Sequence, residues 1–256
     1  MFGDKYIMEK QKKHSRRAIV RIIGITACLA VFLFALYNMI SIIQNYREID
    51  RTYDAATEQF TEIPVPPDIG SQTGGEDNTG VPEVDFEGLL AVNDDIIGWI
   101  YIENTDISYP VLCGRDNQQY LFQSYEKKYL TAGSIYIDYR CSRDFTDSRT
   151  VIYGHNMHNG SMFGKLDKFT KESYMKEHPY VYILLPSGET LKYEVKKAYK
   201  ADVEGKVYDL PSGEAQNPED RKLYLSTCTE DSSDTQRFVV ECDFAESEAK
   251  SMSGKQ

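Results

Sequence analysis

Several motifs that mark common classes of enzyme are missing from this sequence. It has no GxGxxG after a predicted strand and no GxxxxGK(S/T), so nucleotide binding has no support, and no HExxH or CxxC, so structural zinc has none. Histidine is also scarce, with four in 256 residues. His155 and His158 lie three residues apart in a loop rich in Gly and Asn, but no third ligand is near them in the sequence. We therefore expect neither a metal ion nor a cofactor.

Cysteine is sparse and irregularly spaced. There are five: Cys28, Cys113, Cys141, Cys228 and Cys242. An extracellular domain held together by disulfides usually has an even and denser set. A single bridge among the last four stays open, but the pattern favours at least one cysteine kept for its thiol.

Positive charge is scarce in most of the chain. Residues 1–43 hold seven basic and two acidic residues, whereas the remaining 213 residues hold 22 basic and 38 acidic ones, so the two parts carry +5 and −16. An acidic body argues against nucleic-acid binding, because phosphate contacts need a basic face. The composition is otherwise that of a globular protein of one or two domains, with 41% hydrophobic and 27% charged residues.

The longest uncharged run, residues 22–43, reads IIGITACLAVFLFALYNMISII. A helix of that length is about 33 Å long, enough to cross a hydrocarbon core of roughly 30 Å. Five basic residues precede it within residues 12–21. The positive-inside rule then places residues 1–21 in the cytoplasm. We expect residues 22–43 to be a single-pass signal anchor in the cell membrane, with the body of the chain extracellular.

Two other fates of this segment stay open. The first is a cleaved signal peptide, which normally has an apolar stretch of only about 7–15 residues and a small-residue cleavage site. The second is lipidation, because residues 25–28 (ITAC) resemble a lipoprotein cleavage box. Few apolar residues separate Arg21 from Cys28, however, and the apolar run continues well beyond it. A retained anchor is the favoured interpretation.

The composition changes twice beyond the anchor. An amphipathic stalk is predicted first, because apolar residues recur every three or four positions: Tyr46, Ile49, Tyr53, Ala56 and Phe60. Residues 61–83 are rich in Pro, Gly, Asp and Thr, and they complete a stalk and linker over residues 44–83. Residues 84–244 are long enough for one hydrophobic core. Residues 245–256 are predicted to be a disordered tail.

The body is predicted to be mainly β-structure. Roughly eight short apolar runs alternate with turn-rich segments, and hairpins are predicted in residues 96–112 and 180–199. Helices are few and brief; one is expected over residues 85–92, with Asp85 as its N-cap. No strand–helix–strand alternation is present. These features favour a single closed or nearly closed β-barrel.

Two reactive residue types stand at the ends of predicted strands. His155 follows the strand that ends at Gly154, and Cys228 ends the run YLSTC. Arg237 lies nine residues further on and begins the next strand, a spacing that returns it beside Cys228. A thiolate is a nucleophile, an imidazole exchanges protons, and a guanidinium stabilises an oxyanion. Taken singly, each residue also has a plainer interpretation: a buried Cys, an exposed loop His and a solvated Arg.

Longer stretches around these residues resemble one family. YLSTC with Arg nine residues on resembles the signature of the sortases, and YGHNMHNGSMFGKL is similar to the histidine segment of class B sortases. The stretches NDDIIGWIYIENTDISYPVL, DNQQYL and AGSIYIDYR match as well, so the resemblance runs through about residues 86–240. One position departs from the common signature. Tyr224 stands where most sortases have Thr, although class B members vary there.

The resemblance implies a sortase-type, eight-stranded closed β-barrel and a cysteine transpeptidase on the outer face of a Gram-positive cell. Cys228 would attack the Thr carbonyl of a C-terminal sorting motif in a secreted protein and form a thioacyl-enzyme. His155 would protonate the leaving amine, and Arg237 would stabilise the oxyanion. The acyl group would then pass to an amine of a peptidoglycan precursor or cross-bridge.

The resemblance also implies a set of substrate contacts: Asn117, Leu121, Tyr153, Ser226 and Thr229. For Leu121 and Tyr153, a place in the barrel core is an equally natural interpretation. Residues 200–211, between two late strands, would form the loop that reads the sorting motif, and in class B enzymes this loop carries a helix. Class B motifs resemble Asn-Pro-x-Thr.

Two rival functions stay open. One is a different extracellular Cys/His acyl transferase, such as a peptidoglycan L,D-transpeptidase or a cysteine peptidase, which would not require Arg237. The other is a surface or pilus-associated binding module that keeps the barrel without catalysis. The presence of Cys228, His155 and Arg237 together argues against the second.

Overall fold

The computed structural model describes residues 2–62, 80–210, 215–229 and 235–249. These fall into two compact units, Met1–Glu48 and Ile49–Gln256. Most of the predicted linker, residues 63–79, lies outside the described residues, and so does the end of the predicted tail, residues 250–256.

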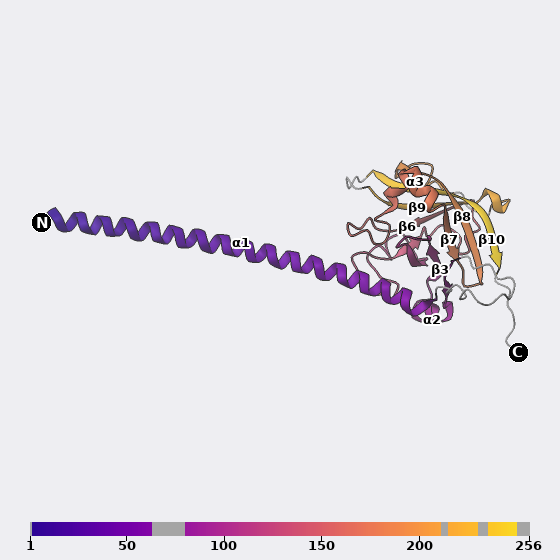
Figure 1. Ribbon diagram of the computed structural model, residues 1–256, viewed down its shortest axis with the longest axis horizontal. Coiled ribbons are helices and arrows are strands. Elements are labelled where there is room, and N and C mark those ends of the chain that lie inside the picture. The colour runs from indigo at the N-terminus through magenta and orange to yellow at the C-terminus, as the bar shows by residue number, and fades with distance from the viewer. Residues whose placement is uncertain (1, 63–79, 211–214, 230–234, 250–256) are drawn as a thin grey trace, which may run out of the picture. The chain divides into compact units, whose positions relative to one another are not determined.

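The chain begins with one long helix, α1 (Phe2–Phe60) (Figure 1). Within the described residues, its segment Arg21–Phe60 is the one helix that is long and apolar enough to cross a membrane, by length and composition. The apolar side chains of residues 22–43 are exposed. The prediction of an uninterrupted apolar helix is confirmed, whereas its passage through a membrane stays a prediction.

The last turns of α1 belong to the second unit. Ile49, Tyr53, Ala56 and Phe60 are all buried there. The ring of Tyr53 meets the ring of Tyr109 edge-on, with centroids 5.3 Å apart, so the helix is fixed by a specific contact. Apolar positions that the sequence assigns to a stalk therefore contribute to the core of the body.

Two small elements lead from this helix into the body. β1 (Thr61–Glu62) and β2 (Glu83–Val84) form a two-stranded antiparallel sheet. The helix α2 (Phe86–Val92) follows. Asp85 accepts a hydrogen bond from the main-chain N–H of Gly88 at 2.9 Å, which satisfies one of the free donors at the helix start. The predicted N-cap is confirmed.

A closed barrel of eight strands forms the body, as the sequence predicts. Around the barrel, the order is β10 (Gln236–Ala249), β8 (Glu189–Asp202), β7 (Tyr180–Leu184), β3 (Ile96–Tyr101), β4 (Ser108–Leu112), β5 (Ile135–Ile137), β6 (Arg149–Tyr153) and β9 (Lys222–Cys228). The pairs β4–β5 and β6–β9 are parallel. Short helical turns lie in the connections: η1 (Leu166–Thr170), α3 (Glu172–Glu177) and η2 (Pro218–Asp220).

The strand β3 shows how the barrel is packed. Five of its six residues are buried, and Trp99 is fully so, because the strand has neighbours on both sides and is covered on both faces. The ladder with β4 is irregular between Ile96 and Gly98. A Cβ atom at Gly98 would lie 2.9 Å from the carbonyl oxygen of Leu184, so only glycine permits this close approach of two strands.

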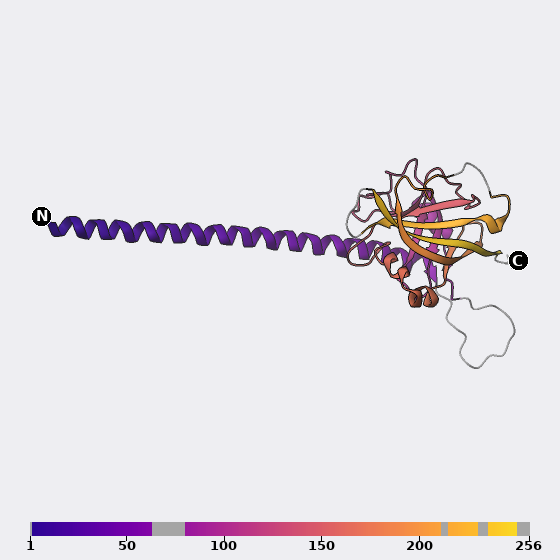
Figure 2. The ribbon, with the colours of Figure 1, turned by 90° about the horizontal axis from the view of Figure 1, so that it is seen from above.

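The two longest strands, β8 and β10, curve together around the barrel, as the orange and yellow ribbons of Figure 2 show. Their ladder continues to the pair Ala249–Glu189, and an ion pair of 2.6 Å joins Lys192 to Glu246. Residues 245–249 therefore form strand where the sequence predicts the start of a disordered tail. The polar composition of residues 245–249 gives no sign that β8 extends equally far and pairs with them.

Candidate active site

Three neighbouring strands bring His155, Cys228 and Arg237 to one end of the barrel. β6 and β9 are parallel, and Tyr153 lies beside Ser226 in their register. His155 and Cys228 each follow this pair by two residues, so they lie at the same end of the two parallel strands. β10 runs antiparallel to β9 and places Arg237 directly across from Cys228. The structure thus brings together the three residues that the sequence singles out.

Cys228 and Arg237 share one face of the sheet. Directly opposed residues of an antiparallel pair point to the same side, with Cβ atoms about 5 Å apart. Cys228 is exposed and Arg237 is half-buried. A guanidinium nitrogen of Arg237 donates to the main-chain oxygen of Gln236 at 2.9 Å, which restrains the side chain.

His155 is held by the segment that precedes β5. Its Nε2 atom lies 2.8 Å from the carbonyl oxygen of Leu121. A carbonyl oxygen can only accept, so this hydrogen bond assigns a proton to Nε2 and leaves Nδ1 as the nitrogen that gains or loses a proton. The ring of Phe122 flanks the imidazole at a centroid distance of 5.6 Å. The predicted substrate residue Leu121 therefore lies beside His155, and its main chain makes the contact.

Asn156 joins the loop that contains His155, called the histidine loop below, to β9, the strand that ends with Cys228. Its side-chain amide donates to the main-chain oxygen of Cys228 at 2.9 Å. One residue before His155, the N–H of Gly154 donates to the oxygen of Ser226 at 3.2 Å. These two bonds extend the β6–β9 pairing past the ends of the strands. Asn156 was not singled out from the sequence, although it directly follows the histidine in YGHNM.

The remaining cysteines of the body have a different environment. Cys113, Cys141 and Cys242 are buried, and none of the five cysteines forms a disulfide. Burial raises the pKa of Cys141 to about 12, and it raises the pKa of Cys113 and of Cys242 as well. These thiols are protonated at neutral pH and unreactive as nucleophiles. Within the body, exposure thus singles out Cys228.

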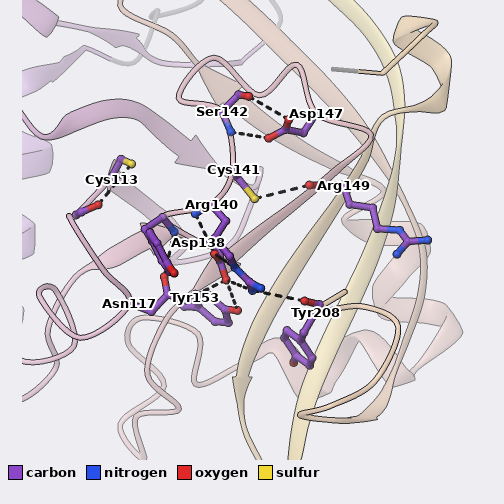
Figure 3. A network of polar contacts seen from close by, with 12 residues as sticks. Cys113, Asn117, Asp138, Arg140, Cys141, Ser142, Asp147, Arg149, Tyr153 and Tyr208 are labelled. Carbon is purple, nitrogen blue, oxygen red and sulfur yellow. Dashed lines mark hydrogen bonds and ion pairs between the residues drawn. The ribbon is translucent and has the colours of Figure 1, made fainter. Parts of the chain in front are cut away.

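Two of the predicted substrate residues meet at a buried carboxylate (Figure 3). Asn117 and Tyr153 both donate to Oδ2 of Asp138, each at 2.9 Å. Arg140 forms an ion pair with the same carboxylate, at 2.8 Å. Asp138 was not singled out from the sequence; its signal is an acidic residue directly after the apolar strand β5.

The other predicted substrate residues flank Cys228 on β9. Ser226 is buried, and its hydroxyl lies 2.8 Å from the hydroxyl of Tyr208. Thr229 is also buried, and its hydroxyl has no hydrogen-bond partner among the described residues. An unpaired buried hydroxyl is costly unless something else satisfies it, and residues 230–234, which follow Thr229, lie outside the described residues.

Tyr208 belongs to the segment between β8 and η2, within the predicted motif-reading loop. Residues 203–210 of this segment are described and form turns without a regular helix. Val207 packs into a hydrophobic cluster with Val151, Tyr224 and Val239, next to the end of β9. The segment is therefore anchored over the strands that carry Tyr153 and Cys228.

Comparisons with known proteins agree with these features. The model of the sortase domain matches residues 100–245, more than half of the chain. The chain is 32% identical to sortase B of Listeria monocytogenes over 151 residues, or 59% of this chain and 58% of that protein. It is 34% identical to sortase B of Staphylococcus aureus over 115 residues, or 45% of this chain and 47% of that protein. The chain thus spans about half the length of these two relatives.

A solved structure of similar fold is a Staphylococcus aureus sortase B–substrate complex. It superposes with a TM-score of 0.55 and 27% identity, and the match covers 63% of this chain and 84% of that chain. All three relatives are named sortase B, in agreement with the class B resemblance of the sequence motifs.

Proposed function

Because the chain belongs to the sortase family, we propose that it is a class B cysteine transpeptidase that attaches secreted proteins to the cell wall. The observation that carries the proposal is the order of three neighbouring strands. β9, which ends with Cys228, lies between β6, which precedes His155, and β10, which carries Arg237. Cys228 is exposed to an incoming peptide, whereas the other thiols of the body are buried. No metal ion or cofactor has a part in the proposed reaction.

The first half-reaction forms a thioacyl-enzyme. The thiolate of Cys228 attacks the carbonyl carbon of a Thr in the sorting motif, and a C–S bond forms as the carbonyl becomes an oxyanion. The peptide C–N bond then breaks, and the leaving amine takes a proton from Nδ1 of His155. Nε2 keeps its proton throughout, because it stays bound to the carbonyl of Leu121.

The second half-reaction transfers the acyl group to an amine. Nδ1 of His155 accepts the proton of the incoming amine, whose nitrogen attacks the thioester carbon. The C–S bond breaks, and the thiolate of Cys228 is restored. A cell-wall amine of a peptidoglycan precursor or cross-bridge is the proposed acceptor, and a pilin lysine is the alternative with the same chemistry.

Arg237 stabilises the oxyanion in both half-reactions. It lies across the ladder from Cys228, so its guanidinium donors reach the region where the negative charge develops. A donor fixed in advance contributes more there than water does, because it needs no reorganisation. Thr229, which directly follows Cys228, is proposed to help shape the same region.

The sorting motif is proposed to bind between the histidine loop and the segment with Tyr208. Asn117, Leu121, Tyr153 and Ser226 line this side by resemblance to class B sortases. Ser226 is two residues from Cys228, and Tyr153 is two residues from His155. The substrate complex of the Staphylococcus aureus relative supports recognition of a substrate peptide by this barrel.

Residues 22–43 are proposed to anchor the enzyme in the cell membrane. The basic residues before them favour a cytoplasmic N-terminus, which leaves residues 84–244 outside as the catalytic domain. Protease added to intact cells should then remove the body and spare residues 1–21. Protection of the body would contradict this orientation, and a lipid found on Cys28 by mass spectrometry would replace the anchor.

The function is tested with the full-length chain in detergent and a panel of fluorogenic Asn-Pro-x-Thr and Pro-x-Thr-Gly peptides. We expect cleavage after Thr, a thioacyl adduct on Cys228, and conversion of the product into a conjugate when an amine is added. Cys228→Ala is the control and should abolish all three.

Different results identify the rival functions. Cleavage that proceeds by hydrolysis alone, with no conjugate at high amine concentration, would indicate a cysteine peptidase. Release of D-alanine from peptidoglycan stem peptides would indicate an L,D-transpeptidase. A Cys228 that reacts with neither peptides nor a thiol-directed probe would indicate a non-catalytic module.

A further inference from the structure

Asp138 is a fully buried carboxylate next to the proposed active site. It directly follows β5, and its side chain has no exposed area. Five donors meet its two oxygens. Arg140 supplies three of them, from Nε at 2.8 Å, from Nη2 at 2.9 Å and from its main-chain N–H at 3.1 Å. Asn117 and Tyr153 supply the other two, each at 2.9 Å (Figure 3).

The carboxylate is held in its ionised form. Burial by itself raises the pKa of Asp138, but the hydrogen bonds from Arg140, Asn117 and Tyr153 outweigh it and hold the pKa below its ordinary value. A buried charge of this kind is a poor source of net stability, because its desolvation offsets most of the attraction. Its more specific effect is geometric, because five donors converge on a single side chain.

Two of the residues that donate to Asp138, Asn117 and Tyr153, are proposed substrate contacts. Asn117 uses its amide nitrogen on Asp138 and its amide oxygen on the N–H of Tyr139, at 3.0 Å, so both ends of its side chain are fixed. Tyr153 uses its hydroxyl proton on Asp138, so it does not serve as an acid toward a substrate. Its ring stacks on Tyr208 at 6.4 Å, with 11° between the planes.

Arg140 extends the same network to the segment 203–210. One of its guanidinium nitrogens donates both to Asp138 and to the main-chain oxygen of Tyr208, at 3.4 Å. The hydroxyl of Tyr208 in turn pairs with Ser226, two residues before Cys228. Asp138 therefore reaches Tyr208 by two routes: the arginine bridge and the ring of Tyr153.

A second arginine holds this segment independently of Asp138. Arg149 donates from Nη1 to the main-chain oxygens of Lys206 at 2.8 Å and Asp209 at 3.0 Å. Because these contacts do not involve Asp138, loss of the carboxylate leaves the segment attached to the barrel. What it loses is the orientation of Tyr208 against Tyr153 and Ser226.

We propose that Asp138 is a positioning residue for the peptide substrate: it fixes Asn117, Tyr153 and Tyr208 as one preformed surface beside Cys228. This inference rests on the proposed transpeptidase function. Asp138 does not touch the peptide, because its side chain is fully buried. Its loss lowers the affinity for the sorting motif and leaves the reactivity of the thiol unchanged.

The test compares Asp138→Asn with two other variants of the full-length chain in detergent. Asp138→Asn keeps the shape of the side chain but replaces one acceptor oxygen with an N–H donor. This donor then faces one of the donors from Arg140, Asn117 or Tyr153. Arg140→Gln removes the bridge to Tyr208, and it also takes the cation away from the buried carboxylate, so its thermal midpoint is read together with its KM. Asp147→Asn is the matched control, because Asp147 is also buried and, among the contacts drawn in Figure 3, accepts hydrogen bonds only from Ser142.

Four measurements are made on each variant: KM and kcat with the Asn-Pro-x-Thr peptide cleaved fastest by the wild type, the alkylation rate of Cys228 by iodoacetamide, and the thermal midpoint. We expect Asp138→Asn and Arg140→Gln to raise KM about tenfold, with kcat and the alkylation rate within about threefold of wild type. Asp147→Asn should leave KM within about twofold, whatever its effect on the midpoint. In a Cys228→Ala background, Asp138→Asn should weaken binding of the same labelled peptide by a similar factor.

Three outcomes overturn the inference. The first is a KM of Asp138→Asn equal to that of the wild type. The second is an equal rise in KM in Asp147→Asn, which would mean that Asp138 has a merely structural role. A loss confined to kcat and to the alkylation rate would place Asp138 in the reaction of the thiol instead. Failure of the proposed function is recognised separately, because the wild type would then cleave no peptide while Cys228→Ala behaved identically.

Discussion

The side-chain amide of Asn156 donates to the main-chain oxygen of Cys228 at 2.9 Å. This bond joins the residue that follows His155 to the proposed nucleophile. Asn156→Ala removes this tie and lets the histidine loop shift relative to β9. We expect kcat/KM for peptide cleavage to fall about tenfold, the size of one well-placed hydrogen bond.

Asn159→Ala is the control for this loop. Its side chain is exposed: the amide nitrogen donates to Asp50 and the amide oxygen accepts from Ser161, so we expect kcat/KM to stay within about twofold. Equal losses in the two variants would mean that the loop acts through its general order and that the bond from Asn156 has no particular role.

Arg237 should be replaceable by neither alanine nor lysine. Arg237→Ala removes the donors proposed for the oxyanion, and we expect kcat to fall about 10²- to 10³-fold. Arg237→Lys restores the charge without the planar fork, so it should recover only part of the rate. Single-turnover measurement of thioacyl formation provides the readout. Full activity of Arg237→Lys would show that charge alone matters.

The thiols should differ sharply in alkylation. At about pH 7–8, Cys228 should react with iodoacetamide at least tenfold faster than Cys113, Cys141 or Cys242, because burial keeps those three protonated and covered. Peptide mapping by mass spectrometry gives the rate at each site. Rapid labelling of Cys141 in the folded chain would contradict the burial that the structure assigns to it.

The end of α1 should stabilise the body. Phe60 is buried, so Phe60→Ala is expected to lower the free energy of unfolding of the body by about 3–5 kcal/mol, and Ile49→Ala by about 2–5 kcal/mol. Glu58→Ala, at an exposed position of the same turns, should change it by less than about 0.5 kcal/mol. Urea unfolding followed by tryptophan fluorescence reports on the barrel, since Trp99 is fully buried there. Unchanged midpoints in Phe60→Ala would assign the helix end to a detached stalk.

Glu241 should contribute stability that depends on pH. Burial by itself raises its pKa, but hydrogen bonds from Lys197, Tyr199 and Lys222 outweigh it and hold the pKa below its ordinary value. Its stabilisation is therefore complete above the unfolded pKa of about 4.3 and is lost as the pH falls through the lower folded pKa. Glu241→Gln should cost about 1–2 kcal/mol near pH 6–7.

The ionic role of Glu241 is recognised by a gap in stability between wild type and Glu241→Gln that closes at low pH. The difference in unfolding free energy between wild type and Glu241→Gln should shrink as the pH falls below about 4. Glu246→Gln, which breaks the half-exposed ion pair with Lys192, should show a gap of at most about 1 kcal/mol. A gap in Glu241→Gln that is constant from pH 7 to pH 3 would contradict the ionic role.

The barrel and the three central site residues could be predicted from the sequence because their signals are local. Short apolar runs bounded by turn residues predict strands, and His155, Cys228 and Arg237 each stand at the end of such a run. The structure adds the register that brings these ends together. Register depends on which strands pair, and no spacing along the chain encodes the parallel pairing of β6 with β9.

The contacts missed from the sequence are those between segments distant along the chain. Asp138 joins Asn117 and Tyr153 only because β5 pairs with β6, with Tyr136 beside Tyr153. Tyr208 approaches Ser226 from a connection whose turns carry no periodic pattern. The burial of Tyr53 was missed for a different reason: an amphipathic helix shows an apolar face without showing what covers it.

The parallel pairing of β6 with β9 also determines when the proposed active site is complete. It joins residues 149–153 to residues 222–226, and such distant pairings form late because a long loop must close first. A chain that is still folding can therefore pair Arg237 with Cys228 across the local β9–β10 hairpin before His155 arrives beside them. Recovery of the proposed peptide cleavage during refolding should report closure of the barrel, and a chain that lacks β9 and β10 also lacks the proposed nucleophile.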